Sequence, residues 1–269
     1  IYTTESSDRA FEEEVMLSGF AQAQVKPEGS GVVFDNAQET FTARYTHETV
    51  ALAFAITEEA IEDNLYDRLA SRYTKALARS MANTKQVKAV SPLINGLPSG
   101  SFQSGDGVTL FNTAHPTIAG TVSNTLAVQA DLNETSLEQS LIDIAAFTDE
   151  RGLKVAARGV RMIVPSELQF TAERLMKSQG RTSTADNDIN AIASMGMIPQ
   201  GYRVNNFLTD TDAFYIITDV PNGMKYFERT PIRTAMEGDF DTGNVRYKAR
   251  ERYRFGVSDY RGIFGVEGA

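Results

Sequence analysis

The chain has two histidines and no cysteine, and this restricts the chemistry that its side chains could perform. Without cysteine there is no disulfide, no thiolate metal ligand and no thiol nucleophile. Asp106 and His115 lie in one glycine-rich segment and could act as a base or as metal ligands in a hydrolase. No further histidine at metal-ligand spacing supports that hypothesis. We interpret His115 as a residue that stabilises a turn, and His47 as a surface residue beside Glu48-Thr49.

Other motifs of catalysis and ligand binding are missing from the sequence. It has no G-x-S-x-G nucleophile elbow, no G-x-x-x-x-G-K-[ST] phosphate loop and no G-x-G-x-x-G dinucleotide motif. No helix pattern follows Gly105-Asp106-Gly107 to present N–H groups to a phosphate. Glu12, Glu13 and Glu14 are consecutive, so a helix would not place them on one face. We therefore predict no catalytic residue, no cofactor and no metal site.

The strongest electrostatic signal is a basic row between Val245 and Val257. Apolar and aromatic residues alternate with it, as in a strand with two chemically different faces. The row consists of Arg246, Lys248, Arg250, Arg252 and Arg254. It could contact nucleic acid or acidic patches on neighbouring copies. Alternatively, it is a solvated face neutralised by nearby acidic residues, namely Glu228, Glu237, Asp239 and Asp241.

Composition indicates a globular protein with an acidic surface. Hydrophobic residues make up 42% of the 269 residues, which supports a core and allows one large domain or two modest ones. The net charge of -9 argues against a surface built as a whole to bind nucleic acid or an anionic membrane. No segment has the apolar length of a membrane span, and no signal peptide is visible. The chain begins with Ile1, so upstream residues were removed or lie outside the sequence.

A strand-like hairpin followed by a long helix is the most distinctive arrangement of predicted elements. Residues 41–45 alternate, and Val50, Leu52, Phe54 and Ile56 share one face of a second run. The outer part of the hairpin, 26–48, is polar and needs another surface, because an isolated ribbon is marginal in water. Lys26, at its base, raises the idea of a Lys–Asn cross-link, for which the sequence identifies no partner.

One helix is predicted over 57–91, with Thr57 as its N-cap and Pro92 with Gly96 as its stop. Its length would be roughly 50 Å. An apolar stripe recurs along it at a spacing of four: Ile61, Leu65, Leu69, Tyr73, Leu77 and Met81. Acidic residues fill its first half and basic residues its second half. Such a rod could pair head to tail with other copies, although a solvated face with a chance gradient explains the charges equally well.

The remaining segments predict an α+β protein without repeated βαβ units. Residues 1–25 form an arm with one short acidic helix near 11–17, and 93–125 and 178–190 are loops. Helices are predicted over 136–149, capped by Ser136, and over 166–176, capped by Ser166. Strands are predicted over 160–164, 202–204, 213–218, 224–227 and 245–257.

The order of these parts resembles the major capsid proteins of tailed bacteriophages with the HK97-type fold, most of all the Mu-type major head subunits. Residues 55–66 (AITEEAIEDNLY) are similar to their junction between the extended E-loop and the spine helix. Residues 106–116 (DGVTLFNTAHP), with Gly120 and Ser123-Asn124, are similar to the loop after that helix. The resemblance to their axial domain rests on Val164-Pro165, Leu168, Asn190 and 207–211 (FLTDT).

This resemblance implies an HK97-like division of the chain. The N-arm would span 1–25, the E-loop 26–56, and the peripheral domain 57–160 with the spine helix over 57–91. The axial domain would span 161–238, and residues 239–269 would return to the peripheral domain as a strand. The missing methionine would then reflect removal of an N-terminal scaffolding segment before Ile1.

The resemblance also implies a structural protein rather than an enzyme. It would self-assemble into hexamers and pentamers of an icosahedral shell around phage double-stranded DNA. Its partners would be other copies, DNA bound weakly and without sequence preference, and portal and cement or decoration proteins, with no membrane. Its location would be the virion, after synthesis in the bacterial host cytoplasm. The alternatives are an encapsulin-like cellular nanocompartment shell and, in a different class, the soluble hydrolase with Asp106 and His115.

Overall fold

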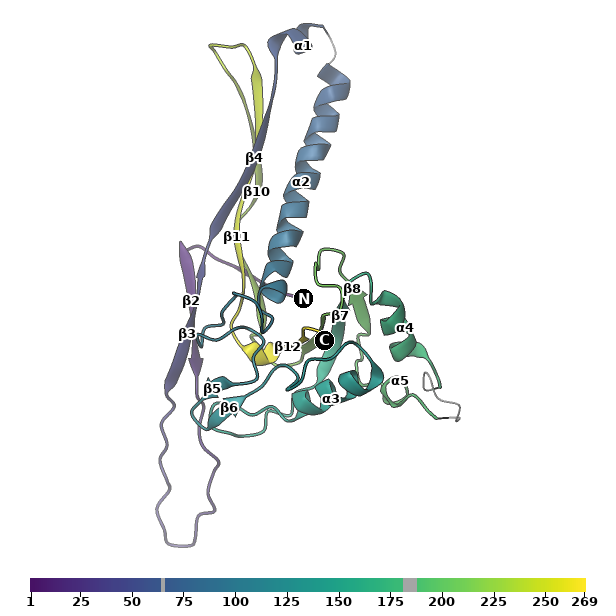
Figure 1. Cartoon of the computed structure of the whole chain (residues 1–269). Coiled ribbons are helices and arrows are strands. Elements are labelled where there is room, and N and C mark those ends of the chain that lie inside the picture. The colour runs from purple at the N-terminus through teal and green to yellow at the C-terminus, as the bar shows by residue number, and fades with distance from the viewer. Residues whose placement is uncertain (64–65, 181–187) are drawn as a thin grey trace.

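The chain forms a long shaft above a broader body, and a thin loop projects from the opposite end (Figure 1). The computed structural model describes residues 1–63, 66–180 and 188–269, with the backbone alone over 66–70. The helices are α1 (Glu58–Glu62), α2 (Tyr66–Ile94), α3 (Glu134–Ala145), α4 (Gln169–Lys177), α5 (Ala191–Met195) and the 3-10 turn η1 (Tyr260–Gly262). The strands are β1 (Thr3–Ser6), β2 (Phe11–Leu17), β3 (Glu39–Thr46), β4 (Glu48–Ile56), β5 (His115–Thr117), β6 (Gly120–Val122), β7 (Gly159–Val164), β8 (Tyr202–Val204), β9 (Phe214–Thr218), β10 (Met224–Gly238), β11 (Val245–Val257) and β12 (Ile263–Val266).

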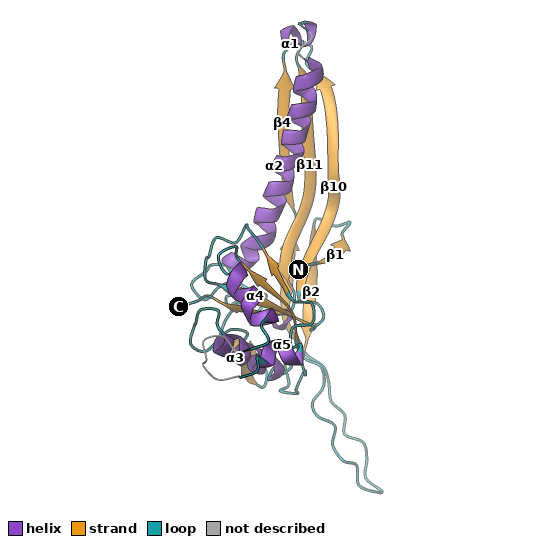
Figure 2. Cartoon of the chain, turned by 90° about the vertical axis from the view of Figure 1, so that its right-hand side faces the viewer, coloured by secondary structure: helices purple, strands orange, loops and turns teal. Residues whose placement is uncertain are grey.

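The shaft is a sheet with one helix laid along it. Its strand order is β1-β10-β11-β4, with β1 parallel to β10 and the other pairs antiparallel. β1 pairs only with residues 225–228, so the upper shaft consists of β10, β11 and β4. Figure 2 shows α2 running beside these strands for most of their length. Leu77 and Met81 of α2 pack on Ala249 of β11, with Phe54 of β4 at the edge of this cluster.

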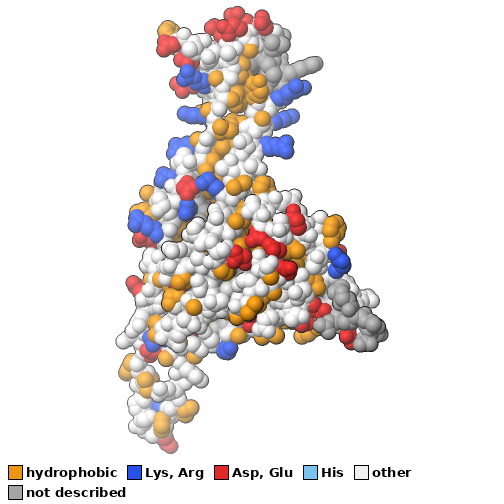
Figure 3. All heavy atoms as spheres, in the orientation of Figure 1, with side chains coloured by type: hydrophobic (Ala, Val, Ile, Leu, Met, Phe, Trp, Pro, Cys, Tyr) orange, Lys and Arg blue, Asp and Glu red, His pale blue; other side chains and the backbone are white. Residues whose placement is uncertain are grey.

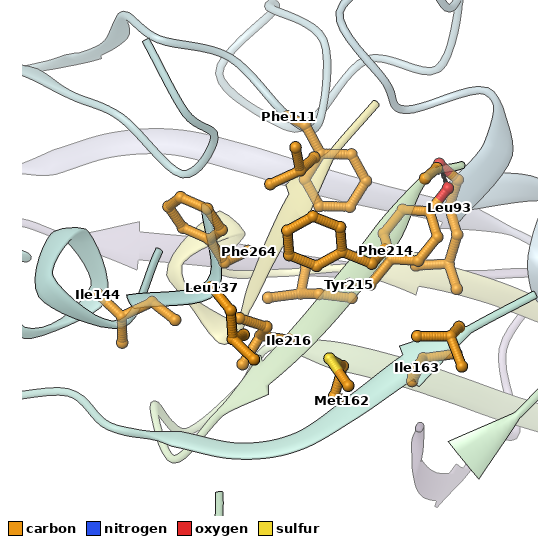
Figure 4. Packing of buried hydrophobic residues seen from close by; sticks show 14 of the residues in the cluster. Leu93, Phe111, Leu137, Ile144, Met162, Ile163, Phe214, Tyr215, Ile216 and Phe264 are labelled. Carbon is orange, nitrogen blue, oxygen red and sulfur yellow. Dashed lines mark hydrogen bonds between the residues drawn. The ribbon is translucent and has the colours of Figure 1, made fainter. Parts of the chain in front are cut away.

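The body has its own core around the sheet β12-β9-β7-β8. Phe214 and Ile216 of β9, Met162 of β7 and Phe264 of β12 are fully buried and lie on the same face of this sheet (Figure 4). Leu137 and Ile144 of α3 cover this sheet from the side. Leu93, in the last turn of α2, joins the same cluster and so fixes the lower end of the shaft to the body.

Several predicted elements are confirmed. Thr57 caps α1, because its hydroxyl accepts a hydrogen bond from the Ala60 N–H at 3.4 Å. β7, β8, β9 and β11 occur where alternation or apolar runs predict them, and β10 begins where predicted but extends to Gly238. α3 begins two residues early because Asn133, not Ser136, is its N-cap; Ser136 completes the capping box from the third helical position. α4 begins after Leu168 without a side-chain cap, so Ser166 does not cap it.

The predicted hairpin pairing is wrong. β3 pairs with β2, and β4 pairs with β11, so the two alternating runs belong to different sheets. Alternation identifies a strand but not its partner. The projecting loop is instead residues 18–38, between β2 and β3 (Figure 1).

Two further predictions need correction. The acidic segment 11–17 is a strand, not a helix, because it pairs with β3 along its length. The long helix is described as two helices: α1 ends at Glu62 with Asp63 as its C-cap, and α2 runs from Tyr66 to Ile94, with Pro92 inside its last turn. Leu65 and Leu69 of the predicted stripe lie outside the described side chains, as does most of the predicted loop 178–190. Gly180 and Ile189 form an isolated antiparallel bridge at the base of that loop.

Candidate assembly interface

The projecting loop exposes large apolar side chains to water, which is unfavourable for an isolated chain. Val25 and Phe34 are 94% and 93% exposed, and Val32 and Val33 are each 68% exposed. Few contacts restrain the loop: the Ala21 N–H donates to Asp35 Oδ2 at 2.7 Å, and Arg151 donates to the Asn36 carbonyl at 2.9 Å. Burying one such side chain stabilises a structure by about 1.5–3 kcal/mol. The loop therefore has much to gain from a surface outside its own chain.

The ribbon that carries this loop continues the exposed apolar surface. On β2, Phe11, Val15 and Leu17 face outward and are exposed, whereas Glu12 and Glu14 face inward. This arrangement reverses the usual one, and alternation alone would have predicted the opposite faces. Arg44 of β3 covers part of the patch, with its guanidinium 4.0 Å from the Phe11 ring centroid. The outward face of the ribbon is thus a second surface suited to contact with another molecule.

A buried lysine holds the ribbon to the shaft. Lys225 of β10 is 5% exposed and forms ion pairs with Glu14 of β2 and with Glu5 of β1, the latter at 3.0 Å. Burial opposes the charged amine, but hydrogen bonds and attraction from both carboxylates outweigh it and raise the pKa of Lys225. Glu14 also accepts a hydrogen bond from Ser258. Sequence reasoning missed this network, because its partners lie far apart in the chain and meet only in the folded protein.

Aromatic packing reinforces the same attachment. Tyr45 of β3 packs on Phe227 of β10, with ring centroids 4.9 Å apart. Its hydroxyl bonds Ser258, and burial raises the pKa of Tyr45 strongly. The Tyr45 ring also lies directly against Gly256, where a Cβ would overlap it. The base of the loop is therefore rigid, while the loop itself is held by few contacts.

The basic row lies where alternation places it, on the face of β11 opposite α2. Arg246 pairs with Asp239, and Arg254 pairs with Glu48. Lys88 of α2 also pairs with Glu48, and this hydrogen bond is the main reason that the pKa of Glu48 is lowered. The row is thus neutralised at its two ends.

The two histidines have structural roles. His115 is buried, its Nδ1 lies 2.5 Å from Asp106 Oδ2, and its Nε2 lies 3.0 Å from Asn124 Oδ1. Its ring stacks on Tyr260 with centroids 3.8 Å apart. The Asp106–His115 pair does form, but with no access for a substrate, so its geometry supports the turn-stabilising interpretation.

The surface role predicted for His47 is wrong. His47 is buried, and its Nε2 lies 2.8 Å from Ser7 Oγ. Ser7 donates its hydroxyl proton to Glu12, so the His47 Nε2–H is the donor to Ser7. Its Nδ1 is buried without a hydrogen-bond partner. Burial and the neighbouring Arg252 lower the pKa of His47.

The described residues contain no group of three or more acidic or histidine side chains arranged to hold a metal ion. Within the same residues, no helix combines the length and apolar character that a membrane span requires. Lys26 is exposed on the loop, with no carboxylate contact among the described residues. What the geometry does offer is extended surface: an apolar loop, an apolar ribbon and a charged shaft on a rigid body. This is the architecture of a subunit that assembles through long, shared interfaces.

Comparisons with solved structures show which fold this architecture belongs to. The capsid of the cyanophage P-SCSP1u aligns with a TM-score of 0.63 at 12% identity, covering 100% of this chain and 86% of that chain. The capsid of Myoviridae phage XM1 aligns with a TM-score of 0.60 at 12% identity, covering 100% and 89%. A virus-like particle from Pyrococcus furiosus aligns at 0.50 and 10% identity, covering 99% and 89%. At these identities the likeness establishes the fold, which is the predicted α+β, HK97-like capsid fold.

A family model described as phage capsid protein matches residues 39–266. The chain therefore belongs to the phage capsid protein family, and its function is that of a major capsid protein of an icosahedral shell. No curated protein sequence matches the chain. The predicted recognition, fold class and function are confirmed at this level. The finer resemblance to Mu-type head subunits stays a prediction.

Proposed function

We propose that this chain builds the head of a tailed phage from hexamers and pentamers that enclose double-stranded DNA. The observation that carries the proposal is the loop 18–38, whose apolar residues are exposed in the single chain. Ordering a backbone costs roughly 1–2 kcal/mol per residue, and this loop has little packing of its own to offset that cost. A neighbouring subunit in a capsomer would supply the missing surface.

The domain assignment belongs to the same proposal. The N-arm (1–25), E-loop (26–56), peripheral domain (57–160 and 239–269) and axial domain (161–238) describe how the subunit would be placed in a capsomer. The pairing of β2 with β3 supports moving the start of the E-loop to Ser18 and its end to Gln38. The shaft would then be the peripheral domain, and it would include β10 (Met224–Gly238), because β10 pairs with β11 along its length. The axial domain would then end before β10, and α4 and α5 would lie in it near the capsomer centre.

The remaining partners and the location are inferred from membership of the family. The net charge of -9 favours weak contact with packaged DNA, because a strongly basic wall would hold phosphates tightly and slow DNA release. Portal and cement or decoration proteins are the other expected partners. We infer synthesis in the bacterial host cytoplasm and no catalytic activity.

The test is assembly of the purified chain, followed by sedimentation and negative-stain electron microscopy. We expect closed, roughly spherical particles with capsomers visible on their surface. A variant in which a short Gly-Ser turn replaces residues 21–35 should stay folded but form no closed particles. Normal particles from this variant would overturn the role of the loop, and a wild-type chain that stays monomeric at high concentration would overturn the proposal as a whole.

A cellular nanocompartment is the second candidate, favoured by the similarity to the virus-like particle from Pyrococcus furiosus. The two functions differ in what the particle contains. Nuclease protection and mass analysis of particles from native cells distinguish them. Protected double-stranded DNA of uniform length indicates a phage head, whereas a single enclosed protein species indicates a compartment.

A further inference from the structure

The free end of the shaft carries a dense group of carboxylates, which we call the acidic tip. It is formed by α1 and the turn between β10 and β11, and Figure 3 shows negative side chains gathered at this end. The two parts touch, because a Cβ on Gly243 would overlap the Glu58 carboxylate. The acidic tip consists of Glu58, Glu59, Glu62, Asp63, Glu237, Asp239 and Asp241. Among the described side chains Arg246 is the cation that pairs within it, through Asp239, so the tip keeps a strong negative charge.

Below the tip, the middle of the shaft is surrounded by exposed cations, which we call the basic belt. The belt has a helix side and a sheet side, and positive side chains are visible along the shaft in Figure 3. The helix side consists of Arg72, Lys75 and Arg79, and the sheet side consists of Arg233, Lys248 and Arg250. None of these side chains forms an ion pair with a described residue. Residues 49–56, 71–84, 229–236 and 246–250 contain no Asp or Glu.

The sheet side of the belt contains a repulsive contact. Arg233 of β10 and Arg250 of β11 are directly opposite in the antiparallel register. Like charges in such a pair destabilise a sheet, because their Cβ atoms lie only about 5 Å apart. A negatively charged group placed between the two guanidiniums would remove this repulsion. The isolated subunit contains no such group among its described residues.

The tip is too far from Arg233 and Arg250 to neutralise this pair in its own subunit. Glu237 is paired in register with Arg246, and Arg250 lies four residues further along β11. That separation is about 13 Å at the rise of a β-strand, which exceeds the screening length of about 8 Å at physiological salt. Both surfaces are therefore free to pair with another molecule of opposite charge.

We propose that the acidic tip of one subunit docks on the sheet side of the basic belt of a second copy of this chain. This inference rests on the proposed shell and names a contact within it. Two different patches of the same chain meet, so the contact is heterologous, and repetition closes it into a ring of shafts around a rotation axis. Carboxylates of the tip would lie over Arg233 and Arg250 and relieve their repulsion.

The sheet side is better shaped than the helix side to receive the tip. Next to the basic residues, β4 presents Ala51, Ala53 and Ala55 on the same face, and all three are exposed. These small side chains leave a flat strip along which another chain can approach closely. Phe240, at the end of the β10–β11 turn, is fully exposed and would be covered by such a strip.

Charge reversal and rescue test the contact in the full-length chain. The tip variant is E58K/E59K/E62K, and the sheet variant is R233E/K248E/R250E. We expect each variant to raise the protein concentration needed for assembly by at least about tenfold, measured by light scattering and negative-stain microscopy. The combined six-residue variant should regain most of the lost assembly, because the charges are again complementary. The neutral variant E58Q/E59Q/E62Q should show a smaller assembly defect than the tip variant. It also avoids placing lysines at the start of α1, where positive charge opposes the helix dipole.

Three controls separate the proposal from its alternatives. The pair E167K and R203E reverses exposed charges elsewhere on the body and should leave assembly within about twofold of wild type. R72E/K75E/R79E reverses the charges on the helix side. If the tip variant restores the assembly of this helix variant and not that of the sheet variant, the choice of the sheet side is overturned. Thermal unfolding monitored by circular dichroism confirms that each variant folds.

The outcomes are distinguishable from failure of the proposed function. If the wild-type chain forms no shells, the proposed function fails. If it forms shells and the sheet variant is not rescued by the tip variant, the tip-to-belt contact is wrong. If the sheet variant assembles normally but its particles lose DNA in a nuclease-protection assay, the belt binds nucleic acid and the proposal is overturned in favour of that partner.

Discussion

The body and the shaft of this subunit bury their apolar residues to very different extents. The body surrounds its sheet with fully buried side chains from β7, β9, β12 and α3. The shaft has one covered face, where the buried cluster consists of Leu77, Met81 and Ala249, and an open face with exposed alanines and cations. The comparison indicates a division of labour. The body supplies the stability of the fold, and the shaft, like the projecting loop, supplies surface for other copies.

The largest expected effect comes from opening the core of the body. Phe214→Ala removes a fully buried ring from the centre of that core, and we expect the free energy of unfolding to fall by about 3–5 kcal/mol. Urea denaturation of the unassembled subunit measures this loss. A loss below about 1 kcal/mol would mean that the body is not the main source of stability.

A smaller effect is expected in the shaft. Met81 is buried between α2 and the sheet, and Met81→Ala should reduce the free energy of unfolding by about 2 kcal/mol, at the low end for buried methionine. The reason is that the shaft consists of a single helix on a single sheet, which can move together to fill the cavity that the shorter side chain leaves. The control is Tyr73→Ala on the same helix, where the side chain is half exposed and the loss should be smaller. Equal losses at Met81 and Phe214 would contradict the difference between the two regions.

A pH effect is expected where the N-terminal strands meet the shaft. Because burial lowers the pKa of His47, the unfolded chain binds the proton more readily than the folded chain. Stability from neutral His47 is then fully present above the ordinary value of 6.5 and is lost as the pH falls below it. The difference in unfolding free energy between wild type and His47→Gln should narrow from pH 7.5 to pH 5. A constant difference would exclude this mechanism.

The smallest effect on stability is expected at the projecting loop. V33S/F34S changes side chains that contact little within the subunit, so the unfolding free energy should stay within about 0.5 kcal/mol of wild type. Assembly should nevertheless weaken at least about tenfold in threshold concentration, as measured by light scattering. Val128→Ser, at another exposed apolar position, should change neither quantity. If V33S/F34S assembles like the wild type, the projecting loop is not an assembly surface.

Local patterns predicted much of this fold because they report on burial within single elements. The alternation of β11, the apolar run of β7 and the cap at Thr57 each follow from short-range geometry. The strand β2 escaped prediction because its glutamates face inward toward Lys225 and its apolar side chains face outward. A strand whose charged residues face inward and whose apolar residues face outward can be recognised only when the residues that it contacts are known.

The candidate assembly interface, like the fold, was predictable from the sequence only in part. The basic row and the charge gradient of the long helix are visible in the sequence, and both are part of the shaft. The Lys225 network and the repulsion between Arg233 and Arg250 are not visible, because each depends on strand register. The buried position of His47 was missed for the same reason, since Ser7 reaches it through the pairing of β1 with β10.

The sequence by itself determined the type of most elements, with β2 as an exception, the charge separation along the shaft and the absence of thiol chemistry, because these depend on residue identity and local spacing. Tertiary structure alone decided which strands pair, that the loop begins at Ser18, and that the acidic tip lies too far from Arg233 and Arg250 to neutralise them. The physical reason is that alternation shows which face of a strand is buried, whereas the partner of each strand is chosen by long-range packing between segments far apart in the chain.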